Sequence, residues 1–164
     1  MDLVLPQAAE FGIQHAITPN WILGLTFDWQ DWKQFSNILV EFEFVSGAVK
    51  SSTGDLNWHD TYSGGISLTH IMGGGTTFLD LGLTYASSPV SDTNRVFLLP
   101  VDDSWTVSFG IAHNASKNLT YSLGGAVVIS GNASVDQTSQ GFRTIGEFST
   151  NLAFVLGATL QWRF

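Results

Sequence analysis

The sequence predicts an all-β protein, an antiparallel transmembrane β-barrel with about seven to eight strands in this chain. Three observations predict this fold: the side chains alternate in character, short and long connections alternate, and the composition is apolar without a long apolar run. Of the 164 residues, 44% are hydrophobic and 12% are charged, and this charged fraction is about half that of an ordinary soluble domain. No segment approaches the roughly 18 consecutive apolar residues of a transmembrane helix. The apolar side chains therefore form either a buried core or the outside of a barrel.

The segment 151–164 carries the clearest alternation. Its first face is apolar: Leu152, Phe154, Leu156, Ala158, Leu160, Trp162 and Phe164. Its second face is small or polar: Ala153, Val155, Gly157, Thr159, Gln161 and Arg163. A barrel of the bacterial outer membrane directs apolar side chains to lipid and small or polar ones to the lumen. A terminal strand that ends in an aromatic residue is characteristic of such barrels, so we predict that Leu160, Trp162 and Phe164 engage the barrel-assembly machinery.

Similar alternation predicts the other strands. The predicted strands cover residues 9–17, 21–30, 58–72, 77–86, 105–112, 119–129 and 151–164. The segment 38–45 is either an extension above the membrane or an eighth strand. Seven antiparallel strands cannot close on themselves without one parallel pair. The count therefore favours half of a larger barrel, unless 38–45 supplies the missing strand.

The connections between the strands alternate in length. Short turns are predicted at 18–20, 73–75 and 116–118, and long connections at roughly 30–60, 87–104 and 131–148. Outer-membrane barrels have short periplasmic turns and long extracellular loops. Aromatic residues lie near the strand ends, as the girdles at the two membrane interfaces require: Trp21, Trp29, Trp58, Tyr85, Trp105 and Trp162.

A soluble lipid-binding β-barrel is an alternative, because up-and-down barrels of that kind also alternate along each strand. Its outer face would carry Lys and Glu, however, whereas the second face of these strands is mostly Gly, Ser, Thr and Ala. The membrane barrel is therefore the favoured interpretation, and it predicts membrane lipids and lipopolysaccharide as partners and the bacterial outer membrane as the location.

Charge and composition exclude several functions. The net charge of −8 argues against nucleic-acid binding, and the absence of cysteine excludes disulfides and thiolate metal sites. The four histidines are scattered without metal-ligand spacing, and no Gly-x-Ser-x-Gly nucleophile motif is present. We therefore predict no catalytic residues, no metal and no cofactor, and we do not expect an enzyme.

The connection 87–104 is the best candidate for a ligand-binding segment. Arg95 precedes Phe97, Leu98 and Leu99, so its cation could hold a fatty-acid carboxylate while the tail lies on these apolar side chains. A second interpretation keeps the arginine within the protein. It would then pair with an acidic residue of the same connection: Asp92, Asp102 or Asp103.

Several short motifs in this order resemble one known family. They are Leu5-Pro6-Gln7, the aromatic and acidic run 26–35, residues 58–62, residues 86–90, Asn94-Arg95 and residues 99–105. Together they resemble the C-terminal portion of the FadL/TodX family, the long-chain fatty acid and hydrocarbon transporters of Gram-negative outer membranes. The resemblance implies a barrel of fourteen strands with an N-terminal hatch, of which this chain covers about the last two-fifths.

The resemblance also implies a function. It predicts a channel through which hydrophobic small molecules, such as long-chain fatty acids, cross the outer membrane by passive diffusion. Residues 1–164 would then be a single barrel domain or a C-terminal barrel fragment. Two alternatives remain open: the soluble lipid-binding barrel, and a small or designed outer-membrane scaffold that does not transport. The scaffold predicts a closed interior packed by Phe78, Val128 and Val155.

Overall fold

The computed structural model describes residues 6–43, 49–55, 57–95, 101–139, 142–149 and 151–164. The strands are β1 (Ala8–Thr18), β2 (Trp21–Gln30), β3 (Asn37–Glu43), β4 (Val49–Asp55), β5 (Thr61–Met72), β6 (Thr77–Ala86), β7 (Ser104–Asn114), β8 (Leu119–Ser130), β9 (Ala133–Ser139), β10 (Phe142–Phe148) and β11 (Asn151–Trp162). A short 3-10 helix, η1 (Trp32–Phe35), follows β2. In this part of the chain no helix is long and apolar enough to cross a membrane.

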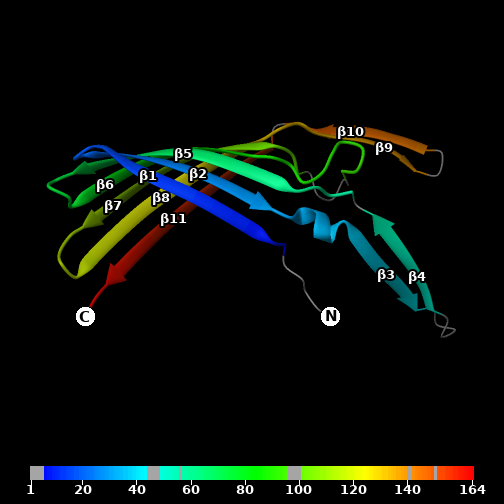
Figure 1. The fold of residues 1–164 in the computed structure, drawn as a ribbon, viewed down its shortest axis with the longest axis horizontal. Helices are drawn as coiled ribbons and strands as arrows, with labels where there is room; N and C mark the ends of the chain where they lie inside the picture. The colour runs from blue at the N-terminus through cyan, green and yellow to red at the C-terminus, as the bar shows by residue number, and fades with distance from the viewer. Residues whose placement is uncertain (1–5, 44–48, 56, 96–100, 140–141, 150) are drawn as a thin grey trace.

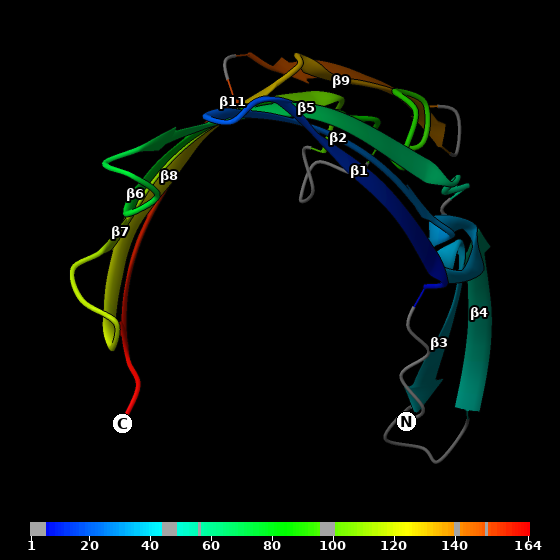
Figure 2. The same cartoon turned by 60° about the vertical axis from the view of Figure 1, so that its left-hand side comes forward.

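Seven strands form the main sheet, in the order β1-β2-β5-β6-β7-β8-β11, and each pairs antiparallel with its neighbours. The sheet is an open arch, with β1 and β11 at its two edges (Figures 1 and 2). The predicted all-β antiparallel architecture with seven crossings is confirmed. Because the number of strands is odd, β1 and β11 run in the same direction. To close as an antiparallel barrel, this sheet therefore needs an odd number of further strands between β11 and β1. A second copy of the same seven strands in the same orientation would instead pair β11 with β1 in parallel.

The register of the main sheet separates an apolar face from a polar face, because residues directly opposite one another in paired strands share a face. One row across the sheet is apolar on all seven strands: Ile13, Leu25, Ile66, Leu83, Val107, Val127 and Phe154. The adjacent row on the other face is small or polar: Gln14, Gly24, Ser67, Gly82, Ser108, Ala126 and Val155. Along β7 the apolar residues are exposed and the polar ones are half-buried. Side chains crowd together on the concave side of an arch, so the apolar face is the convex one.

Small residues on the polar face allow the strands to curve tightly. A Cβ atom added to Gly65 would lie 2.8 Å from Thr26 Oγ1 and 2.9 Å from Thr84 Oγ1. Alternation of glycine with hydroxyl side chains therefore leaves room on the concave side. The predicted turn at 73–75 is confirmed, and its three glycines have positive φ angles of 59°, 66° and 93°, a conformation that glycine adopts without a steric penalty.

Two hairpins lie apart from the main sheet. β3 pairs only with β4, and β9 pairs only with β10. Residues 38–43 of the segment 38–45 are therefore part of an extension beyond the sheet rather than an eighth barrel strand (Figure 2), and residues 44–45 lie outside the described residues. The long connections predicted at roughly 30–60 and 131–148 contain strands that the sequence did not predict: β4 in the first, and β9 and β10 in the second. β4 and β9 consist mostly of polar and small residues, so they lack the apolar alternation that revealed the strands of the main sheet.

The buried apolar residues lie outside the main sheet. Among the described residues, the buried hydrophobic side chains are Val90, Ala133 and Val135, and the largest fully buried ones are Arg95 and Val135. They come from the connection that follows β6 and from β9. These two segments lie close together at the end of the sheet from which the long connections leave (Figure 1).

Candidate ligand-binding site

A pocket of about 450 Å³ lies at the end of the main sheet where the long connections begin. The polar face of the sheet contributes Asp28 and Ser63, and the connections contribute Trp32, Trp58 and Pro89. Ligand pockets of proteins commonly enclose roughly 300–1,000 Å³ and combine apolar walls with a few polar groups. This pocket has both properties, and it opens on the concave side of the arch.

Two tryptophans form one wall of the pocket. The rings of Trp32 and Trp58 meet edge to face, with centroids 5.7 Å apart and an interplanar angle of 65°, an arrangement that aromatic pairs favour. The indole N–H of Trp32 donates to Gln30 Oε1 at 2.9 Å. The backbone N–H of Trp58 donates to the buried Ser36 Oγ at 3.1 Å. The 3-10 helix and the residue that follows it therefore position both rings.

The sheet supplies a carboxylate to the pocket. Asp28, near the end of β2, accepts a hydrogen bond at its Oδ2 atom from the Ser63 hydroxyl at 2.8 Å. Both side chains lie on the polar face, because Asp28 and Ser63 are direct partners in the β2–β5 register. This carboxylate is therefore held by a neighbouring strand on the lumen side of the wall.

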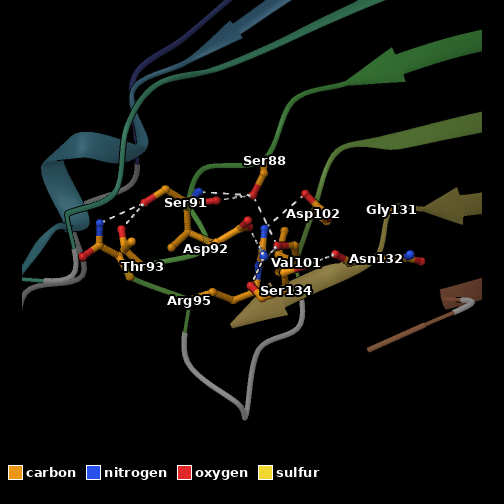
Figure 3. A network of polar contacts seen from close by, with 12 residues as sticks. Ser88, Ser91, Asp92, Thr93, Arg95, Val101, Asp102, Gly131, Asn132 and Ser134 are labelled. Carbon is orange, nitrogen blue, oxygen red and sulfur yellow. Dashed lines mark hydrogen bonds and ion pairs between the residues drawn. The ribbon is translucent and has the colours of Figure 1, made fainter. Parts of the chain in front are cut away.

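Arg95 stabilises the connection between β6 and β7, of which four described residues line the pocket. Its Nε donates to the Val101 carbonyl oxygen at 2.8 Å, and its Nη2 donates to Asp102 Oδ1 at 3.1 Å. Its Nη1 donates to Asp92 Oδ1 at 2.6 Å and also to the Ser134 carbonyl oxygen. The side chain is only 1% exposed. Figure 3 shows these donors converging on both ends of the connection and on β9.

We call residues 87–95 and 101–103, together with the β9–β10 hairpin, the loop cap. The Gln137 side-chain amide donates to the Arg95 carbonyl oxygen at 2.7 Å, and the Asp136 backbone N–H donates to the Asp92 carbonyl oxygen at 3.0 Å. The backbone N–H of His59 donates to the Pro89 carbonyl oxygen at 2.8 Å. These bonds hold the connection against both the hairpin and the segment that leads into β5, and so fix the position of its lining residues beside the pocket.

The structure describes only one of the four residues predicted to bind a ligand. Arg95 is buried and paired with Asp92 and Asp102, as the second interpretation of the sequence expected. Its binding of a carboxylate stays a prediction, and Phe97, Leu98 and Leu99 lie outside the described residues.

The terminal residues lie where the alternation placed them. Leu160 and Trp162 are on the apolar face of β11 and are exposed, and Phe164 is exposed beyond the strand. Their engagement by the barrel-assembly machinery stays a prediction.

Trp32, Trp58 and Asp28 were not among the residues predicted for a ligand site. Trp58 was predicted to start a strand and to join a membrane girdle. The structure instead begins β5 at Thr61 and turns the Trp58 ring toward Trp32. The density of aromatic and acidic residues in 26–35 was the available signal, but residues 28 and 58 are brought together only by the pairing of β2 with β5.

A seven-stranded arch with an apolar convex face and a polar concave face is the wall of a transmembrane β-barrel. The sequence matches, over residues 1–164, the family described as outer membrane protein transport protein (OMPP1/FadL/TodX). The chain belongs to this family, and the resemblance found in its motifs is confirmed.

The structure is similar to the crystal structure of a Pseudomonas aeruginosa FadL homologue, with a TM-score of 0.80 and 15% sequence identity. The match covers 96% of this chain and 35% of that chain. The chain thus spans about a third of the length of that protein. No curated protein matches the sequence.

Proposed function

We propose that the chain forms part of the wall of a channel through which hydrophobic compounds diffuse across the bacterial outer membrane. The observation that carries this proposal is the pocket at the polar face of the arch, lined by Trp32 and Trp58 and by Ser87, Pro89, Val101 and Asp102 of the connection that follows β6. A ligand captured at this end would enter the lumen along the polar face. The family of transport proteins to which the chain belongs supports this function.

The two alternatives are less well supported. A scaffold that does not transport would have a closed interior packed by Phe78, Val128 and Val155, whereas the family to which the chain belongs is one of outer membrane transport proteins. A soluble carrier would not belong to a family of outer membrane transport proteins. Neither passive diffusion nor long-chain fatty acids as cargo follow from these observations, and both stay predictions.

Uptake by whole cells tests the proposal. The full-length protein would be expressed in a Gram-negative host that lacks its own channel of this class, and uptake of radiolabelled toluene and oleate would be measured. We expect expression to accelerate uptake of at least one of the two compounds. Unchanged uptake of both, with the protein correctly inserted in the outer membrane, would contradict the channel.

A matched pair of variants locates the route. Ser63→Trp places a bulky ring in the pocket, whereas Thr144→Trp adds the same bulk to an exposed position of β10. We expect the first to slow uptake and the second to leave it unchanged. Gel mobility of heated and unheated samples would establish that both variants fold as barrels.

A further inference from the structure

The charges around the pocket are acidic. Asp28 and Asp102 line it, and no Lys or Arg is found among the described residues that do so. The nearby Arg95 donates to Asp92, to Asp102 and to the carbonyl oxygens of Val101 and Ser134. A ligand carboxylate would have to displace these acceptors from a buried guanidinium in order to reach it.

Asp28 can still accept a hydrogen bond. Its Oδ2 atom is bonded to the Ser63 hydroxyl, and no other hydrogen bond to the Asp28 side chain is found within the described part of the chain. Glu10 lies directly opposite Asp28 in the β1–β2 register and so on the same face. Two carboxylates side by side raise the negative potential on the polar face next to the pocket, and this potential repels an anion and attracts a hydrogen-bond donor or a cation.

The aromatic wall of the pocket favours the same ligands as the carboxylates do. Trp32 and Trp58 both line the pocket, and an aromatic wall packs favourably against the ring of a ligand. The face of a tryptophan ring attracts cations, because the π-system carries negative charge density there. The wall and the carboxylate therefore favour the same kind of molecule, a ring with a polar group that donates.

From these observations we propose that the pocket prefers hydrophobic ligands with a hydrogen-bond donor, such as phenols and benzylamines, over hydrophobic carboxylates. The ring lies against Trp32 and Trp58, and the donor points to Asp28. This inference rests on the proposed function, since it names the substrate class of the same pocket. It goes beyond that function because it gives fatty-acid anions the lower affinity.

A series of brominated ligands of nearly equal size tests the preference. The purified full-length protein would be titrated in detergent at neutral pH with 4-bromophenol, 4-bromobenzylamine, 4-bromotoluene and 4-bromobenzoate. Bromine in contact with a tryptophan ring quenches its fluorescence. We expect the phenol and the amine to bind about tenfold more tightly than the benzoate, which corresponds to one hydrogen bond to a charged group. The affinity for 4-bromotoluene should lie between the affinity for the benzoate and those for the phenol and the amine.

Three variants assign the effect to the pocket. Asp28→Asn keeps the size of the side chain but removes its charge, and it should reduce the preference over benzoate severalfold. Asp80→Asn is the matched control, because Asp80 also lies on the polar face but does not line this pocket. Trp58→Phe should reduce the quenching by the bromophenol.

Equal or tighter binding of the benzoate, or an unchanged preference in Asp28→Asn, would overturn the inference. So would the absence of quenching by all four ligands. The uptake assay separates this failure from a failure of the channel. If expression still accelerates uptake of toluene or of oleate, the channel stands and only the ligand preference is lost. If it does not, the proposed function fails as well.

Discussion

The main sheet and the loop cap sort their side chains in opposite ways. In the sheet, large apolar side chains point outward, and Phe109 and Leu156 are 51% and 79% exposed. In the loop cap, Val135 is buried, and the Arg95 guanidinium is enclosed by its hydrogen-bond partners. Apolar side chains are thus exposed in one region and buried in the other. The boundary between the two regions lies at the strand ends, where the ring centroids of Tyr85 and Trp105 are 5.1 Å apart.

The difference follows from the surroundings of each region. Lipid around a barrel makes an exposed apolar side chain favourable and an exposed charge costly, while the closed hydrogen-bond network satisfies the backbone. Water around a loop restores the usual arrangement, in which apolar side chains are buried and a buried charge needs partners. Substitutions with equal chemistry should therefore have unequal effects in the two regions and on the two faces.

The largest expected effect is a charge on the apolar face of β11. Leu156→Arg places a cation near the middle of the strand on the lipid side, and we expect it to reduce the free energy of unfolding by about 2–4 kcal/mol. Val155→Arg is the control, because the adjacent residue lies on the polar face. Urea unfolding of the full-length protein from phospholipid vesicles measures both. Equal losses would contradict the assignment of the faces.

The next effect concerns the buried cation of the loop cap. Arg95→Met leaves the carboxylates of Asp92 and Asp102 without their main donor, and we expect a local loss of about 1–3 kcal/mol. Hydrogen exchange should become faster in residues 87–95 and in β9 and remain slow in the main sheet. Arg143→Met, which breaks the exposed pair with Asp136, should change exchange much less. Faster exchange throughout the sheet would show that the two regions are not separable.

A smaller effect distinguishes two glycines on neighbouring strands. A Cβ atom at Gly125, on the apolar face, would lie 2.8 Å from both Leu156 Cδ2 and Phe109 Cζ, whereas at Gly157 nothing lies within 4 Å. Gly125→Ala forces these side chains out of their rotamers, at a cost of about 0.5–1.5 kcal/mol. Gly157→Ala should be neutral or stabilise by up to about 1 kcal/mol. The reverse order in urea unfolding would contradict the described register of β8 and β11.

The smallest effect is the acid response of the β9–β10 hairpin. The hydrogen bonds from Arg143 lower the pKa of Asp136 below its ordinary value of 3.8. The contribution of this pair to stability is therefore fully present above pH 3.8 and is lost as the pH falls through the lowered pKa. Hydrogen exchange of the hairpin should become faster only in that acid range. Arg143→Gln should remove this step, and a step that remains in the variant would have another cause.

Much of the fold could be predicted because its signal is local. Alternation along 77–86 or 151–162 assigns both the strand and the lipid-facing side, since successive side chains of a strand point to opposite faces. The hairpin of β9 and β10 escaped this reasoning because it lies outside the main sheet, where no face is required to be apolar. Its strands were visible only in the backbone pairing of Ala133–Ser139 with Phe142–Phe148.

Alternation and motif order are properties of neighbouring residues, so the strands of the main sheet, their two faces and the family could be recognised in the sequence alone. The sequence allowed two roles for Arg95, an ion pair within the protein or a contact with a ligand. Only the tertiary structure placed Arg95 among Asp92, Asp102 and the Ser134 carbonyl. It also brought Asp28, Trp58 and Asp102 to one pocket. The physical reason is that such contacts join segments far apart in the chain, and their meeting depends on strand pairing and loop packing, which no local pattern encodes.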